Sequence, residues 1–261
     1  MQQAYRVLRV VSEAQTIRMV LSAQPDELML NELVRACALY TEKPESSTVG
    51  GVKAIVLDFT GAAASAGDTQ ESSSPAVEQV EQARQAVQEL APPVLAVVRA
   101  TLSPQASALA HAADLLLAAH DALLTITDPH CQHDQLSGEQ AARLGYVTWS
   151  VPANSLKEEM ERILDMLRDK SAIALRHAKA ATRLGIETGG GQKVPCAENE
   201  QLVTPTENSV ETPYPVGGAE QRLAALTHVN AFYLAATMQT EDAQEGLHSF
   251  LEKRQPLWKN F

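Results

Sequence analysis

The sequence has few basic residues. It contains 21 Lys and Arg against 32 Asp and Glu, which gives a formal net charge of −11 at pH 7. A nucleic-acid-binding protein needs a basic surface to neutralise phosphates, so this charge excludes nucleic acid as the expected partner. The same charge counts against any large anionic ligand, unless basic side chains are gathered locally.

Long apolar runs and paired cysteines are also absent. No run approaches the roughly 20 apolar residues of a membrane span. The start of the chain lacks the basic-then-apolar pattern of a signal peptide, so we expect a cytoplasmic protein that does not bind membranes. Three widely spaced cysteines, Cys37, Cys131 and Cys196, do not make a disulfide framework. With 261 residues, of which 45% are hydrophobic, the chain is long enough to bury a sizeable core.

Hydrophobic patterning predicts an α/β protein. Alternating residues in 5–11 and 16–21 predict an antiparallel hairpin, and the apolar runs 52–57 and 93–98 predict strands covered on both faces. Further strands are expected at residues 123–127 and 146–151. The expected helices are residues 28–38, 76–90, 104–119, 137–144, 155–168, 172–184, 219–238 and 241–254. The alternation of strands and helices predicts a mostly parallel sheet.

The helix expected at 104–119 has a recognisable start. Ser103 is a favourable N-cap, Pro104 is tolerated at the first helical position, and alanine and leucine continue to Ala119. Composition divides the chain into an α/β core (1–185), a surface loop rich in Gly, Pro, Thr, Asn and Glu (186–217), and a C-terminal helical region (218–261).

Four stretches, taken together, resemble the crotonase (enoyl-CoA hydratase/isomerase) superfamily. Residues 52–68 are similar to the family's strand followed by a Ser-Ala-Gly loop, and residues 93–128 align without a gap to its central segment. Residues 136–152 resemble its helix–Leu-Gly–strand–Val-Pro element, and residues 240–259 resemble its C-terminal helix. The resemblance implies a divergent member with the crotonase-like spiral of ββα units and a C-terminal helical region.

The resemblance also implies a substrate and an oxyanion hole. The substrate would be an acyl-CoA thioester, with coenzyme A as part of the substrate and no separate cofactor. Backbone amides of Asp68 and Gln105 would stabilise the enolate, and Ala66 and Lys253 would contact CoA. Asp68 is an uneasy donor, because a carboxylate beside a developing enolate oxygen is unfavourable unless it points away. The turn at 104–106, Pro-Gln-Ala, replaces the family's glycine triplet.

The family's two carboxylate positions differ in this sequence. Ala108 stands at the first, and Asp128 stands at the second, where the family usually has Glu. Hydration uses both acids around one water, so the resemblance favours isomerase-type proton transfer by Asp128, with His130 as a second candidate base. Asp128 can equally cap the turn before Pro129. Two ligand loops, at 22–25 and 129–135, are shorter than in the family, so a catalytically silent subunit or scaffold remains an alternative.

The loop between Asp128 and Leu136 holds other potential ligands. His130, Cys131, His133 and Asp134 could bind a transition metal, although their spacing matches no standard zinc motif. Cys131 could act as a nucleophile, but it has no defined base partner. An ordinary polar loop is the simplest interpretation, and we expect no metal.

Two further patterns concern partners. Arg176, Lys179 and Arg183 share one helical face, which predicts either a solvated surface or a local positive patch for a CoA phosphate. Five of the eleven aromatic residues lie within residues 232–261, a concentration that indicates packing between the terminal helices or against a neighbouring subunit. The resemblance implies a homo-oligomer, a trimer or a hexamer.

Overall fold

A computed structural model describes residues 5–13, 15–41, 51–60, 75–126, 135–189 and 219–260. Its centre is a six-stranded sheet of order β1-β2-β3-β4-β5-β8. The strands are β1 (Arg9–Glu13), β2 (Thr16–Ser22), β3 (Ala54–Thr60), β4 (Val94–Val98), β5 (Leu115–Ala119) and β8 (Trp149–Val151). Only β1 runs antiparallel to its neighbour, so the predicted hairpin and the mostly parallel sheet are confirmed.

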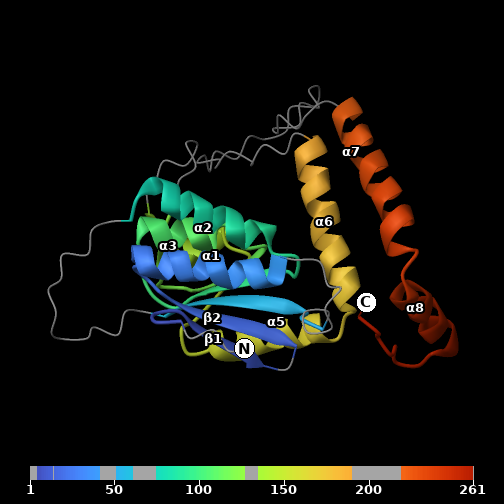
Figure 1. The fold of residues 1–261 in the computed structure, drawn as a ribbon, viewed down its shortest axis with the longest axis horizontal. Helices are drawn as coiled ribbons and strands as arrows, with labels where there is room; N and C mark the ends of the chain where they lie inside the picture. Colours follow the sequence, from blue (N-terminus) through green and yellow to red (C-terminus); the bar gives the residue numbers. More distant parts are fainter. Residues whose placement is uncertain are drawn as a thin grey trace, which may run out of the picture.

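Eight α-helices and one π-helical turn surround the sheet in the described part of the chain (Figure 1). They are α1 (Glu27–Thr41), α2 (Val77–Glu89), α3 (Pro104–Ala110), α4 (Gly138–Arg143), α5 (Leu156–Arg168), α6 (Ala172–Gly189), α7 (Ala219–Phe232), the π-helix η1 (Tyr233–Thr237) and α8 (Glu241–Glu252). Helices α1, α2 and α3 lie over one face of the sheet, and α5 lies below the other.

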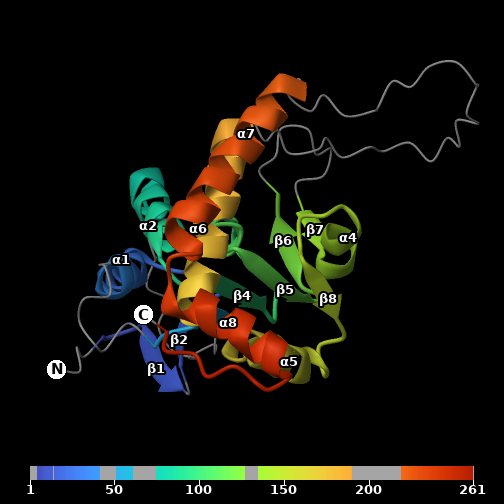
Figure 2. The same ribbon diagram turned by 90° about the vertical axis from the view of Figure 1, so that its right-hand side faces the viewer.

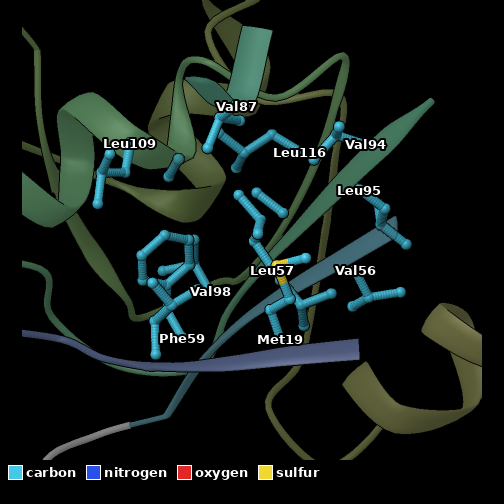
Figure 3. Packing of buried hydrophobic residues seen from close by; sticks show 14 of the residues in the cluster. Met19, Val56, Leu57, Phe59, Val87, Val94, Leu95, Val98, Leu109 and Leu116 are labelled. Atoms are coloured by element: carbon cyan, nitrogen blue, oxygen red, sulfur yellow. The ribbon is translucent and has the colours of Figure 1, made fainter. Parts of the chain in front are cut away.

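The two covered faces explain why the central strands are almost entirely apolar. On the face toward α2 and α3, the side chains of Met19, Leu57 and Phe59 form a closely packed cluster (Figure 3). Val56 lies on the other side of β3 and is also buried, at 1% exposure. A strand buried on both faces has no reason to alternate polar with apolar residues.

The prediction of one helix over 104–119 is wrong. Helix α3 ends at Ala110, and Leu115–Ala119 forms β5, paired in parallel with β4 and β8. Alanine and leucine favour helix in isolation, but this apolar segment is buried between two strands and two helix layers. Tertiary burial therefore overrides local propensity here.

The strand expected at 123–127 also has a different place. It forms β6 (Leu123–Thr125), which pairs antiparallel with β7 (Gln135–Ser137) in a separate two-stranded sheet. The prediction that it joins the parallel core is wrong, because β5 takes that position.

The C-terminal elements lie beside the core. Helices α6 and α7 are side by side in both views (Figures 1 and 2), and α8 follows η1. The buried Asp242 carboxylate at the start of α8 accepts hydrogen bonds from the backbone N–H of Lys259 (2.7 Å) and Asn260 (3.0 Å). Trp258 Nε1 donates to the carbonyl of Asp169 at 2.8 Å, so the tail is tied to the end of α5. The loop predicted at 186–217 lies mostly outside the described residues.

Candidate functional site

The candidate site lies where α3 begins, at the carboxyl edge of the parallel sheet. The N–H of Ser103 donates to Ala23 O (2.9 Å), just after β2, and the N–H of Ala23 donates to Thr60 O (3.1 Å), at the end of β3. The N–H of Leu102 donates to Leu123 O (2.9 Å), at the start of β6. Backbone hydrogen bonds therefore fix the start of α3 between the ends of three strands.

The first turn of α3 is formed as the sequence predicts. Ser103 Oγ accepts a hydrogen bond from the N–H of Ala106 (3.2 Å), and Pro104 occupies the first helical position. Gln105 lies in this turn and is half-buried. Because α3 has seven residues, few peptide dipoles align along it, and we expect its dipole to stabilise an anion only modestly.

Ser107 is a site residue that the sequence interpretation missed. It is fully buried on α3, and its Oγ accepts a hydrogen bond from the N–H of Thr125 at 3.0 Å. Thr125 ends β6, three residues before Asp128. Ser107 thus ties the strand that leads to Asp128 to the helix that carries Gln105. A lone serine in an alanine-rich helix gives no signal of this contact before the fold is known.

Several predicted site residues lie outside the described residues. Ala66 and Asp68 belong to residues 61–74, which follow β3. Asp128 and His130, with Cys131, His133 and Asp134, belong to residues 127–134, which join β6 to β7. Their roles stay predictions. Among the residues that the structure does describe, no group of three His, Cys, Asp or Glu side chains is placed to hold a metal ion.

The structure does not bring Lys253 and Gln105 together within one chain. Lys253 caps the C-terminus of α8 in the left-handed conformation (φ 53°), and its side chain is exposed. Helix α8 lies at the opposite end of the molecule from α3 along the long axis (Figure 1). Within a single chain, Lys253 is therefore remote from the proposed oxyanion hole.

Two of the three side chains on the basic face of α6, Lys179 and Arg176, anchor the helix to the core, and the third, Arg183, is half-buried near Asp114. Lys179 is buried, and its Nζ lies 2.6 Å from Asp114 Oδ2 and donates to Pro92 O at 3.0 Å. Arg176 donates to Val52 O at 3.4 Å. Burial lowers the pKa of Lys179 to about 8, although the Asp114 carboxylate opposes this shift.

Comparison with known proteins identifies the fold. The structure is similar to an enoyl-CoA hydratase from Mycobacterium smegmatis, with 20% sequence identity, a TM-score of 0.65, and coverage of 97% of this chain and 99% of the other. It is also similar to an enoyl-CoA hydratase from Bacillus anthracis, with 19% identity, a TM-score of 0.66, and coverage of 98% of this chain and 100% of the other. A third similar structure is an enoyl-CoA hydratase/isomerase from Mycobacterium paratuberculosis, with 17% identity, a TM-score of 0.67, and coverage of 99% of this chain and 100% of the other. No protein-family model and no curated protein matches the sequence.

These likenesses extend over nearly the whole of each chain, so the protein has the crotonase fold. The fold resemblance stated from four sequence stretches is confirmed. The low identities agree with a divergent sequence on a retained scaffold, and fold alone does not assign the reaction. Separately, no helix in the described ranges is both long and apolar enough to cross a membrane.

Proposed function

We propose that the protein binds an acyl-CoA thioester and stabilises its enolate. The observation that carries this proposal is the fixed position of the first turn of α3, beside the end of β3 and the start of β6. In that place the Gln105 amide can serve as one donor to a thioester oxygen, and the Asp68 amide, on the segment after β3, can serve as the other. Donors aimed at a developing oxyanion are commonly the largest single contribution to such catalysis.

The proton-transfer step rests on fewer groups than in a two-acid hydratase. Ala108 offers only a methyl group, so Asp128, with His130 as a second candidate, is the base in this proposal. One base can remove a proton from one carbon of the enolate precursor and return it to another. The proposal is therefore an isomerase-type proton shift, in which no water is added.

A second candidate function is a catalytically silent subunit. It is favoured by Ala108 at one carboxylate position and by Pro104-Gln105-Ala106 in place of a glycine turn. The core is intact, and the departures fall at positions that the family resemblance assigns to the ligand site. A protein that keeps only the scaffold would show this distribution of changes.

We also propose that the protein assembles as a homo-oligomer, a trimer or hexamer, through its C-terminal helices. Phe250, Leu251 and Leu257 are 81%, 75% and 78% exposed in the single chain. Large apolar surfaces of this kind are typical of subunit contacts. In such an assembly, Lys253 would contact CoA bound to a neighbouring copy, since it is remote from α3 of its own chain.

Titration with CoA and a panel of short enoyl-CoA thioesters, followed by a double-bond migration assay, tests the catalytic proposal. Gln105→Pro removes one amide donor in the first helical turn, where proline is tolerated. We expect a loss in kcat of about 10²- to 10³-fold. Gln105→Ala is the matched control: it keeps the amide and should keep the activity. Thermal unfolding would verify that both variants fold.

Two outcomes contradict the catalytic proposal. Absence of binding to any thioester at millimolar concentration would favour the silent subunit. Turnover that survives Asp128→Ala would remove Asp128 from the role of base, and the same assay on His130→Ala would then test the second candidate.

A further inference from the structure

A cleft of about 780 Å³ lies between α2, the end of α3 and α6. It is at the amino ends of β4 and β5, because Pro93 and Asp114, which precede these strands, both line it. The candidate oxyanion hole is at the carboxyl edge of the same sheet. The cleft is therefore a separate site, and the sequence alone does not indicate it.

Aliphatic side chains make up about half of the cleft lining. These aliphatic side chains come from α6 and from the segments at the start of β4 and β5. They include Pro93, Ala112, Leu115, Leu175, Ala178 and Ile186. The volume of the cleft is within the range of small-molecule sites, which is roughly 300–1,000 Å³.

Two cationic side chains of the cleft lie next to Asp114. Its Oδ2 lies 2.6 Å from Lys179 Nζ and accepts a hydrogen bond from the N–H of Val94 at 2.8 Å, while its Oδ1 lies 3.8 Å from Arg183 Nη2. One carboxylate thus faces two cations. Lys179 is the buried partner, with a side chain only 5% exposed, and Arg183, at 36%, is the cation open to the cleft.

The other acid of the cleft is at its rim. Glu89, near the end of α2, is exposed, and its Oε1 accepts a hydrogen bond from Gln85 Nε2 at 2.7 Å. Solvent screens this charge more strongly than the charges near the buried Lys179. The inner end of the cleft therefore has an excess of positive charge, next to an aliphatic wall.

We propose that this cleft binds an aliphatic carboxylate, with its head group at Arg183 and its chain along the wall between α6 and the start of β5. A guanidinium binds a carboxylate through two parallel hydrogen bonds. The 3.8 Å between Arg183 Nη2 and Asp114 Oδ1 is longer than a hydrogen bond, so Arg183 can form both bonds with a ligand. The chain is buried against aliphatic side chains, which supplies the remainder of the affinity. The inference needs no CoA and stands apart from the proposed function.

Isothermal titration of the full-length protein with decanoate tests the inference. Decanoate should bind. Decylamine should bind at least tenfold more weakly than decanoate because its head group is cationic. Butyrate should also bind at least tenfold more weakly, because its chain is short. Equal affinity for decanoate and decylamine would overturn the proposal, and so would no decanoate binding at millimolar concentration.

Two variants place the ligand. Arg183→Gln removes the head-group partner, and Ala178→Leu fills the cleft from an exposed position of α6; each should weaken decanoate binding at least tenfold. Arg143→Gln, which removes an exposed arginine on α4, is the matched control and should leave binding unchanged. Decanoate binding unaffected by both cleft variants would place the ligand elsewhere and contradict the inference, whatever the outcome of the thioester assays.

Discussion

At the scale of single residues, buried charged groups join elements that the backbone alone would not connect. The Glu32 carboxylate on α1 accepts hydrogen bonds from the N–H groups of Arg6 (2.7 Å), Val7 (3.0 Å) and Leu8 (2.9 Å). Burial raises the pKa of Glu32, but these three donors outweigh that effect and hold it below its ordinary value. The segment before β1 is thereby fixed to α1 without any strand pairing.

Lys179 plays a similar part for α6, and it makes stability depend on pH. Its pKa of about 8 in the folded protein is below the ordinary value of 10.5, so the unfolded chain binds more protons between these two values. The free energy of unfolding must then rise as the pH rises through this window. We expect a rise of about 1 kcal/mol between pH 8 and 9 from this group.

Urea unfolding at a series of pH values measures this effect. The rise should be lost in Lys179→Met, whose side chain does not titrate. Burial raises the pKa of the Cys37 thiol to about 12 in the folded protein. The unfolded chain loses this proton at a lower pH, so Cys37 should lower the free energy of unfolding above pH 9 and partly offset the effect of Lys179. A Lys179→Met protein with the same slope between pH 8 and 9 as the original would show that another group is responsible.

At the scale of elements, the packing of α4 on β5 depends on one glycine. A Cβ built on Gly138 would overlap the carbonyl oxygen of Ala119 and lie 3.0 Å from the Cβ of Ala118. The N–H of Gly138 donates to Ala122 O at 2.7 Å, so the backbone cannot simply move away. The close approach of helix and strand therefore requires the absence of a side chain.

We expect Gly138→Ala to lower the free energy of unfolding by about 1–3 kcal/mol, since the helix must shift from the strand. Gly51→Ala is the control, because a Cβ there meets nothing within 4 Å; its effect should stay within about 0.5 kcal/mol. Chemical denaturation of both variants measures the difference. Equal stabilities would contradict the close packing of α4 on β5.

At the scale of the whole molecule, half of the large exposed apolar side chains among the described residues belong to the C-terminal helices and the tail. On α7, Ala225 is buried, whereas Leu223 and Leu226 are 66% and 59% exposed. On α8 and the tail, Phe250, Leu251 and Leu257 are also exposed. One side of the helical region therefore packs on its own chain, and another side is exposed and open to a partner.

If that partner is a second copy, Phe250→Glu should dissociate the oligomer, because a charge at a buried subunit contact is costly. Val77→Glu is the matched control: Val77 is 84% exposed on α2, in the core part of the chain. Size-exclusion chromatography with light scattering should find a reduced mass for the first variant alone. A monomeric original protein would contradict the homo-oligomer.

Much of the fold could be predicted from periodicity. The β1–β2 hairpin alternates with a period of two residues and helix α2 repeats its apolar residues with a period of 3.6, so each pattern fits one element type well. The apolar run of β3 is short and flanked by glycine, which favours a strand over a helix. The start of α3 was predictable from Ser103 and Pro104, whose capping chemistry is local. Of the candidate site, this first turn is the part that both the sequence and the structure describe.

Other features required the assembled protein. Leu115–Ala119 is as apolar as a helix core and becomes a strand only because β4 and β8 offer hydrogen-bonding edges on both sides. Ser107, Asp114 and Lys179 have partners at sequence separations that no local pattern reveals. The sequence by itself determined which segments are buried and where helices begin, since these depend on near neighbours. Only the tertiary structure decided which apolar segment enters the sheet, where the basic face of α6 docks and where the cleft opens, because these depend on the burial of groups far apart in the chain.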